Sequence, residues 1–236
     1  MTSVPVSHGV PDAATGVEPS EVVGRYLEAI YYMEVEGERA WSARLADWLG
    51  VSRPTVTIGI RRMIRDGLVT VSDKKAIELT EPGRKRAAAI VRRHRIMERW
   101  LTDGLGLDWV SADEEAARLE HAVSDKVEQA VWEQLGRPST CPHGNPIPGV
   151  SSLARGEERL SSAAVGERVR VTRISEVAER EAPVLLSYLG ERGIVPRASI
   201  QVLERDSLGD TLRLLVQGHE FTIAIRVAEK VWAVKA

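Results

Sequence analysis

The sequence predicts a mainly α-helical chain that ends in a small β-rich domain. Between about residues 20 and 135, apolar residues recur at helical spacing, with capping residues and glycines between the segments. After the proline- and glycine-rich stretch 137–150, short runs typical of strands replace these helical segments. Charge divides the chain as well, because residues 39–99 hold 15 Lys and Arg but 6 Asp and Glu. That segment carries +9 and the remainder −11, which indicates a basic, polyanion-binding module.

Composition limits the classes of protein to which the chain can belong. Its 236 residues suffice for two or three compact domains, and no apolar run approaches the ~20 residues of a membrane span. The N-terminus lacks an apolar signal core, and the single cysteine, Cys141, excludes an internal disulfide. We therefore expect a cytoplasmic protein without membrane contact, in which Cys141 is a solvent-near bystander.

The N-terminal region is predicted to be a flexible tail followed by three helices. Residues 1–19 mix proline, glycine and hydroxyl side chains without periodicity, and a helix follows over 20–36. Next, WSARLADWLGVSRPTVTIGIRRMIR (41–65) holds two short amphipathic segments joined by a tight turn. Ser52 is suited to cap the second segment, and Pro54 is tolerated in its first turn.

That second segment has the composition of a recognition helix. Its outward face carries hydroxyls, an isoleucine and arginines, which hold phosphates, reach guanine edges or touch thymine methyls in the major groove. An ordinary helical hairpin with a solvated basic face is the alternative. In the DNA-binding interpretation, Ser52, Pro54 and Ile58 touch base edges or methyls. The residues predicted to face DNA are Ser42, Arg44, Ser52, Arg53, Pro54, Thr55, Thr57, Ile58 and Arg62.

Two short strands are predicted at 68–71 and 76–79, around a basic tip at 72–75. A basic hairpin after a recognition helix is a wing, which lies along the sugar-phosphate backbone. Three helices and this hairpin predict a winged helix-turn-helix domain over 20–88.

Three further helices exceed what such a DNA-binding unit needs, so residues 89–150 are assigned to dimerisation. The first is capped by Thr80 and runs to about Asp103, the second runs from Ser111 to Val123, and the third, capped by Ser124, runs from Asp125 to Leu135. Three tryptophans could serve the dimer interface or a local core, namely Trp100, Trp109 and Trp132.

The C-terminal residues 151–236 are predicted to form an SH3-like β-barrel. Short strands are expected at 168–174, 199–203, 212–216, 221–225 and 231–234, with a helix at 181–192. Gly218 and His219 are placed at a hairpin tip, where His219 would be a turn residue.

A candidate metal site lies in the dimerisation helices. His94 and Glu98 share a helix face, and the next helix carries Asp113, Ala117, Glu120 and His121 along one stripe. Imidazole and carboxylate groups that converge from two helices suit Mn, Fe, Co, Ni or Zn, whereas the alternative is an ordinary surface ion pair. A metalloenzyme is not expected, because the chain shows no HExxH helix, phosphate-binding glycine loop or nucleophile elbow. The charge asymmetry also argues against a protein-interaction adaptor.

Six blocks together resemble one family: RYLEAIYYMEVEG, SRPTVTIGIRRMIRDGLV, LTEPGR, RRHRIMERWLTDGLGLD, DEEAARLEHAVSDKVE and PHGNPIPG. From about Ser20 to Gly149 the chain resembles the diphtheria toxin repressor family of metal-dependent transcriptional regulators, with its iron- and manganese-sensing branches. The resemblance implies a homodimer that binds palindromic operator DNA and represses genes of metal homeostasis. It also implies activation by Fe²⁺ or Mn²⁺, with Co²⁺, Ni²⁺ or Zn²⁺ as surrogates, through ordering of the first helix.

The resemblance places His94, Glu98 and Asp113 at the ancillary site of the iron branch, where Asp113 replaces a histidine. In the family, that site takes further ligands from the SH3-like domain. Glu179 or Glu181 could supply one here.

The primary, regulatory site is matched by Glu120 and His121, and Glu28 matches a carboxylate of the manganese branch. Two positions depart, because Arg25 stands where the branches have Met or Asp, and Ala117 where they have Cys or Glu. A guanidinium there repels a cation and favours pairing with Glu120 or Glu28. The alternative function is therefore a DNA-binding regulator that is metal-independent at the primary site, either constitutive or answering to another effector.

Overall fold

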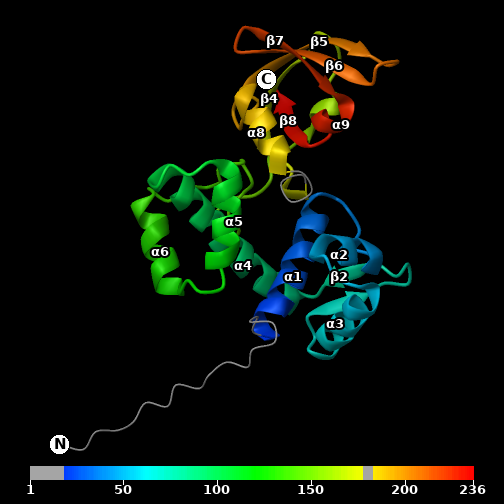
Figure 1. The fold of residues 1–236 in the computed structure, drawn as a ribbon, viewed down its shortest axis with the longest axis vertical. Helices are drawn as coiled ribbons and strands as arrows, with labels where there is room; N and C mark the ends of the chain where they lie inside the picture. Colours follow the sequence, from blue (N-terminus) through cyan, green and yellow to red (C-terminus); the bar gives the residue numbers. More distant parts are fainter. Residues whose placement is uncertain (1–18, 178–182) are drawn as a thin grey trace, which may run out of the picture.

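The computed structural model describes residues 19–177 and 183–236, so the tail predicted for 1–19 lies almost wholly outside the described residues. Figure 1 shows three lobes along the chain: a blue-to-cyan helical lobe, a green helical lobe and a yellow-to-red β lobe. The mainly helical architecture with a small C-terminal β domain is therefore confirmed. None of the described helices is long and apolar enough to cross a membrane.

The first lobe is a winged helix-turn-helix. It contains α1 (Pro19–Val35), α2 (Ser42–Leu49), α3 (Arg53–Arg65) and an antiparallel hairpin of β1 (Val69–Val71) and β2 (Ile77–Leu79). Ser52 caps α3 as predicted, because its Oγ accepts a hydrogen bond from the Thr55 amide at 3.3 Å. The inner faces of the helices form one core, in which Leu27, Leu45 and Met63 are fully buried.

The second lobe contains α4 (Glu81–Arg99), a π-helical turn η1 (Trp100–Gly104), α5 (Trp109–Leu119) and α6 (Asp125–Gln134). Thr80 caps α4 as predicted, since its Oγ1 accepts from the Gly83 amide at 3.1 Å. The predicted start of the next helix at Ser111 is wrong. Its cap is Asp108, whose Oδ1 accepts hydrogen bonds from the amides of Val110 and Ser111, each at 3.1 Å. The carboxylate satisfies two amides that have no partner inside the helix.

The third lobe is a six-stranded antiparallel sheet in the order β3-β8-β4-β5-β6-β7. Its elements are β3 (Glu158–Arg159), η2 (Leu160–Ser162), β4 (Arg168–Ile174), α8 (Pro183–Glu191), β5 (Ser199–Asp206), β6 (Thr211–Val216), β7 (His219–Ala224), α9 (Ile225–Ala228) and β8 (Val231–Lys235). One face of the sheet, together with the short helices, buries a core that includes Ile174, Leu212 and Leu214.

Two details of this lobe differ from the sequence-based expectation. His219 is not at the hairpin tip, because it opens β7 opposite Val216, and the turn is made by Gln217 and Gly218. Both turn residues have positive φ, at 50° and 85°, as a two-residue hairpin of type I′ requires. The strands β3 and β8 also pair at the sheet edge, and the two-residue β3 is too short to show a pattern in the sequence.

Candidate metal centre and DNA-binding face

The outer face of α3 is exposed along its length. Val56, Ile60 and Met63 turn inward, and Gly59 lets α3 approach α1, since a Cβ there would lie 3.1 Å from Tyr26 Cζ. Arginines and hydroxyls face outward together with Ile58, which is 69% exposed. The exposed members of the predicted DNA-facing set are Ser42, Ser52, Arg53, Pro54, Thr55, Thr57, Ile58 and Arg62. This face therefore offers cations for phosphates and an apolar side chain for a thymine methyl.

Arg44 is placed differently from the other members of that set. It is half-buried, its guanidinium lies 3.3 Å from Glu38 Oε2, and it stacks 5.6 Å from the Trp48 ring centre. An arginine held in this way contributes to the packing of α2 as well as to the positive charge of the lobe.

His94 is the centre of the buried polar cluster in the second lobe. Its Nδ1 lies 2.7 Å from Glu120 Oε2, and its Nε2 lies 3.3 Å from Asp113 Oδ1. Burial alone would lower the pKa of His94, but hydrogen bonds to Asp113 and Glu120 raise it well above its usual value. An imidazole of α4 flanked by Asp113 of α5 and by Glu120 at the end of α5 is a donor set suited to a divalent ion.

Among the residues that the structure describes, three groups of potential ligands include or adjoin this cluster. Within each group, one ligand atom per residue lies within 4.8 Å of the others. The groups are Glu28, His94 and Glu120; His94, Glu98 and Asp113; and Glu98, Cys141 and His143. The first two groups combine residues that the sequence had singled out, so the structure brings His94, Glu98, Asp113, Glu120 and Glu28 together.

The third group was missed by the sequence-based reasoning, and Cys141 is buried rather than solvent-near. His143 is fully buried, its Nδ1 lies 2.9 Å from Glu98 Oε1, and the Trp109 ring packs edge-on at 4.7 Å between ring centres. Burial alone would raise the pKa of Glu98, yet His143 and then His94 lower it below its usual value. The Cys-x-His spacing at 141–143 was the one local signal for this group.

Helix α1 forms the other wall of the centre. Glu28 Oε1 accepts a hydrogen bond from the Tyr32 hydroxyl at 2.9 Å. Arg25, Ala117 and Glu28 line one hollow of about 320 Å³ between α1 and α5, which Glu120 and His121 also line. Arg25 is exposed in this hollow, and Ala117 offers no side-chain donor.

His121 lies beside the first two groups without belonging to either. Its Nε2 is 3.3 Å from Glu120 Oε1. Its ring touches α1 at Gly24, where an added Cβ would be 2.9 Å from Cε1 of the ring. The glycine therefore allows α1 to close over His121 and the neighbouring carboxylates.

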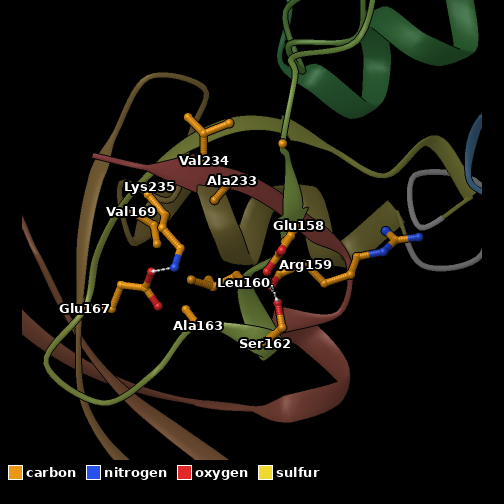
Figure 2. A pocket seen from close by; sticks show the side chains of 11 residues that line it. Glu158, Arg159, Leu160, Ser162, Ala163, Glu167, Val169, Ala233, Val234 and Lys235 are labelled. Carbon is orange, nitrogen blue, oxygen red and sulfur yellow. Dashed lines mark hydrogen bonds and ion pairs between the residues drawn. The ribbon is translucent and has the colours of Figure 1, made fainter.

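A second hollow lies in the third lobe, between β3, η2, β4 and β8 (Figure 2). It measures about 20 Å³, enough for about one water molecule. Lys235 Nζ lies 3.2 Å from Glu167 Oε1, and Figure 2 marks this ion pair among the residues that line the hollow. This hollow is too small for a ligand.

Three family signatures match successive parts of the chain. Residues 19–77 match the iron dependent repressor N-terminal DNA binding domain, 80–149 match the iron dependent repressor metal binding and dimerisation domain, and 158–235 match the FeoA domain. The iron-dependent repressor IdeR of Mycobacterium tuberculosis is 38% identical over 206 residues, which cover 83% of this chain and 88% of that protein. The chain belongs to the diphtheria toxin repressor family.

Other comparisons agree with this assignment. The diphtheria toxin repressor of Corynebacterium diphtheriae is 37% identical over 190 residues, or 77% of this chain and 84% of that protein. A solved manganese-dependent transcriptional repressor in complex with manganese superposes with a TM-score of 0.81 at 31% identity, over 91% of this chain and 100% of that one. As a member of the diphtheria toxin repressor family, this chain is a metal-dependent DNA-binding transcriptional repressor and not an enzyme. Its domains imply DNA and a second copy of the chain as partners.

The resemblance to the family implied that the third lobe supplies a further ligand to the metal centre, and Glu179 and Glu181 were the candidate residues. Both lie outside the described residues. Glu176 lies just before them and lines a small pocket with His94 and Glu28. Its carboxylate pairs with Arg95 at 2.6 Å, and burial raises its pKa. The third lobe thus does place a carboxylate beside the centre, although an arginine already engages it.

Proposed function

We propose that this repressor controls genes of metal homeostasis and binds a palindromic operator as a homodimer when Fe²⁺ or Mn²⁺ is present. One observation supports the proposal most directly: Glu28 on α1 lies in one ligand group with His94 and Glu120 of the second lobe. Residues of the DNA-binding domain and of the dimerisation domain would then share one ion. Sharing it would hold the recognition helix at a defined place in the dimer.

The donor chemistry of the groups fits such ions. Glu28, Glu120 and His94 provide oxygen and nitrogen donors, which suit Mn²⁺ and Fe²⁺ and also accept Co²⁺, Ni²⁺ or Zn²⁺. Asp113 and Glu98 would complete an ancillary set on the other side of His94. The group with Cys141 and His143 adds a thiolate and favours a softer ion such as Zn²⁺.

The DNA contacts follow from the exposed face of α3. Ser52, Pro54 and Ile58 would touch base edges or thymine methyls, and Arg53 and Arg62 would hold phosphates. Two copies related by a twofold axis would present two such helices, so the half-sites should lie about one helical turn, or ~34 Å, apart or a multiple of it. We place this activity in the cytoplasm.

A second candidate keeps the DNA binding and removes metal control at the primary site. It is favoured by Arg25, which brings a guanidinium into the hollow beside Glu28 and Glu120, and by Ala117, which supplies no ligand. A guanidinium that reached from α1 to Glu120 would fix α1 against the second lobe without an ion. The regulator would then be constitutive or answer to another effector.

Operator binding across a divalent-metal titration, with a chelated control at fixed salt, tests the first candidate. Binding that requires Mn²⁺ or Fe²⁺ supports it, and equal binding in chelator supports the second candidate. Sequence-independent binding in both conditions would refute the regulator function.

The variant Arg25→Met with Ala117→Cys tests the second candidate. Removing the guanidinium and adding a donor should increase the metal response. An unchanged response would show that Arg25 does not substitute for an ion.

A further inference from the structure

The C-terminal end of α1 enters a buried ionic cluster of the third lobe. Glu36 directly follows α1 and is only 6% exposed. Its Oε1 accepts a hydrogen bond from Arg173 of β4 at 2.5 Å, and its Oε2 accepts one from Trp232 Nε1 of β8 at 3.0 Å. Arg159 of β3 lies 2.8 Å from the same Oε2. These partners are far from Glu36 in sequence, so the cluster joins the first lobe to the third.

The cluster is organised around a tryptophan ring. The guanidinium of Arg159 lies 3.7 Å from the Trp232 ring centre, and that of Arg173 lies 4.4 Å from it. Figure 2 shows that the Arg159 side chain extends away from the small hollow of the third lobe. Arg173 also donates to Glu157 at 2.9 Å, so two arginines and two glutamates balance in charge. We call Glu36, Glu157, Arg159, Arg173 and Trp232 the α1 latch.

The chain that leaves β4 reinforces the α1 latch. Val177 is fully buried and belongs to the core of the first lobe. One residue earlier, Glu176 pairs with Arg95 of α4, whose guanidinium lies 6.0 Å from the Tyr32 ring centre on α1. The third lobe therefore meets the first at Glu36 and through Val177, and it reaches Tyr32 of α1 indirectly, through Arg95 of α4.

The same helix carries the metal-centre carboxylate. Glu28 and Glu36 are eight residues apart, which is about 12 Å along a helix axis. Between them α1 is rigidly packed, with Ala29, Ile30 and Met33 fully buried. Contacts that hold α1 at Glu36 therefore also favour the position of Glu28 at the metal centre. By the same coupling, a metal ion bound at Glu28 would favour the contacts of Glu36.

We propose that Glu36 is a positioning residue through which the third lobe holds α1 so that Glu28 lies beside His94 and Glu120. The inference deepens the proposed function, because it adds a hold on α1 that is independent of any ion. Weakening the α1 latch should release the C-terminal half of α1 and lower the affinity of the centre for metal.

The test compares Glu36→Gln with Glu204→Gln in the full-length protein. The control removes the same charge from an exposed glutamate that pairs with Arg213 at 2.7 Å in the third lobe. Amide hydrogen exchange in chelator should become at least tenfold faster in α1 for Glu36→Gln and stay unchanged for the control. The Mn²⁺ concentration at half-saturation should rise about five- to tenfold for Glu36→Gln alone, within the usual range of coupling between sites.

Each outcome decides the inference. Unchanged exchange in α1, or a lower melting temperature with unchanged Mn²⁺ affinity, would overturn the positioning role. If the wild type binds no metal, the metal part of the proposed function fails, and operator binding in chelator replaces the metal readout. A loss of that binding in Glu36→Gln would support the latch, and no loss would overturn it. Should Glu36→Gln not fold, Trp232→Phe takes its place, because it removes the donor to Glu36 and reduces the ring on which Arg159 and Arg173 stack.

Discussion

Replacing Arg62 by alanine should weaken DNA binding without changing which sequence is preferred. Arg62 lies on the outer face of α3, with about half of its side chain exposed, and its Nε is 3.8 Å from Asp66 Oδ2. That ion pair is long and exposed, so it contributes little to folding. The guanidinium can therefore turn to a phosphate, and its removal should leave the fold intact.

The size of the effect follows from counterion release. Each phosphate contact contributes about 0.9 to the slope of log affinity against log salt. A dimer carries two copies of Arg62, so the slope should flatten by about 2. Two such contacts increase the affinity at ~0.1 M salt by at most about sixtyfold over the affinity at 1 M salt. The loss of affinity in Arg62→Ala at ~0.1 M salt should therefore not exceed this factor. Asp66 keeps its ion pair with Arg65, at 3.1 Å, so the substitution does not leave a bare carboxylate beside the DNA.

The assay is operator binding from about 0.05 to 0.5 M salt, at saturating metal, with matched and single-mismatch operators. Arg213→Ala is the control, because it removes an equal charge from an exposed arginine paired with Glu204 and Glu220 on the third lobe. It should leave the slope unchanged. If Arg62→Ala instead relaxed the preference at one base pair and kept the slope, Arg62 would read a base, and the assignment to phosphate would be wrong.

Three further predictions concern other parts of the molecule. Burial alone would raise the pKa of Glu36, but Arg173 and Arg159 hold it below its usual value of 4.5. Without metal, the wild type should therefore melt at a higher temperature than Glu36→Gln above pH 4.5. This difference in melting temperature should vanish as the pH falls well below that value, because Glu36 is then protonated. Cys141→Ser should lower Zn²⁺ affinity at least tenfold and abolish the sulfur-to-metal absorption of the Co²⁺ form, and a Co²⁺ spectrum identical to that of the wild type would exclude the thiolate as a ligand. Ile58→Ala should cost about 1 kcal/mol of operator affinity at one A·T position, with unchanged stability and salt slope; a uniform loss over all positions would contradict contact with a base.

Local signals were sufficient to predict the caps of α3 and α4. Ser52 and Thr80 act as caps because each needs only an amide three residues away, which the sequence shows directly. The start of α5 was misplaced because Asp108 and Ser111 are both good caps, and only the backbone geometry decides between them. The two-residue strand β3 carries no period at all and exists because β8 lies beside it.

In the candidate metal centre too, some residues could be found from local spacing, whereas others are brought together only by the fold. His94 and Glu98 could be paired from helical spacing, and the resemblance to a family placed Glu28 and Glu120 with them. Cys141 stands in a proline-rich segment that suggested an exposed linker, yet the segment folds against β4 and is buried. Glu36 looked like an ordinary residue at a helix end, because its partners are 137 and 196 residues away.

His94 belongs to two of the three ligand groups, and Glu98 also belongs to two. None of the groups contains Arg25 or Ala117, so each group has its three potential ligands without a donor from either position. A change at His94, by contrast, breaks two groups in a single step. Replacing His94 should therefore weaken metal binding more than replacing Glu28, which belongs to a single group.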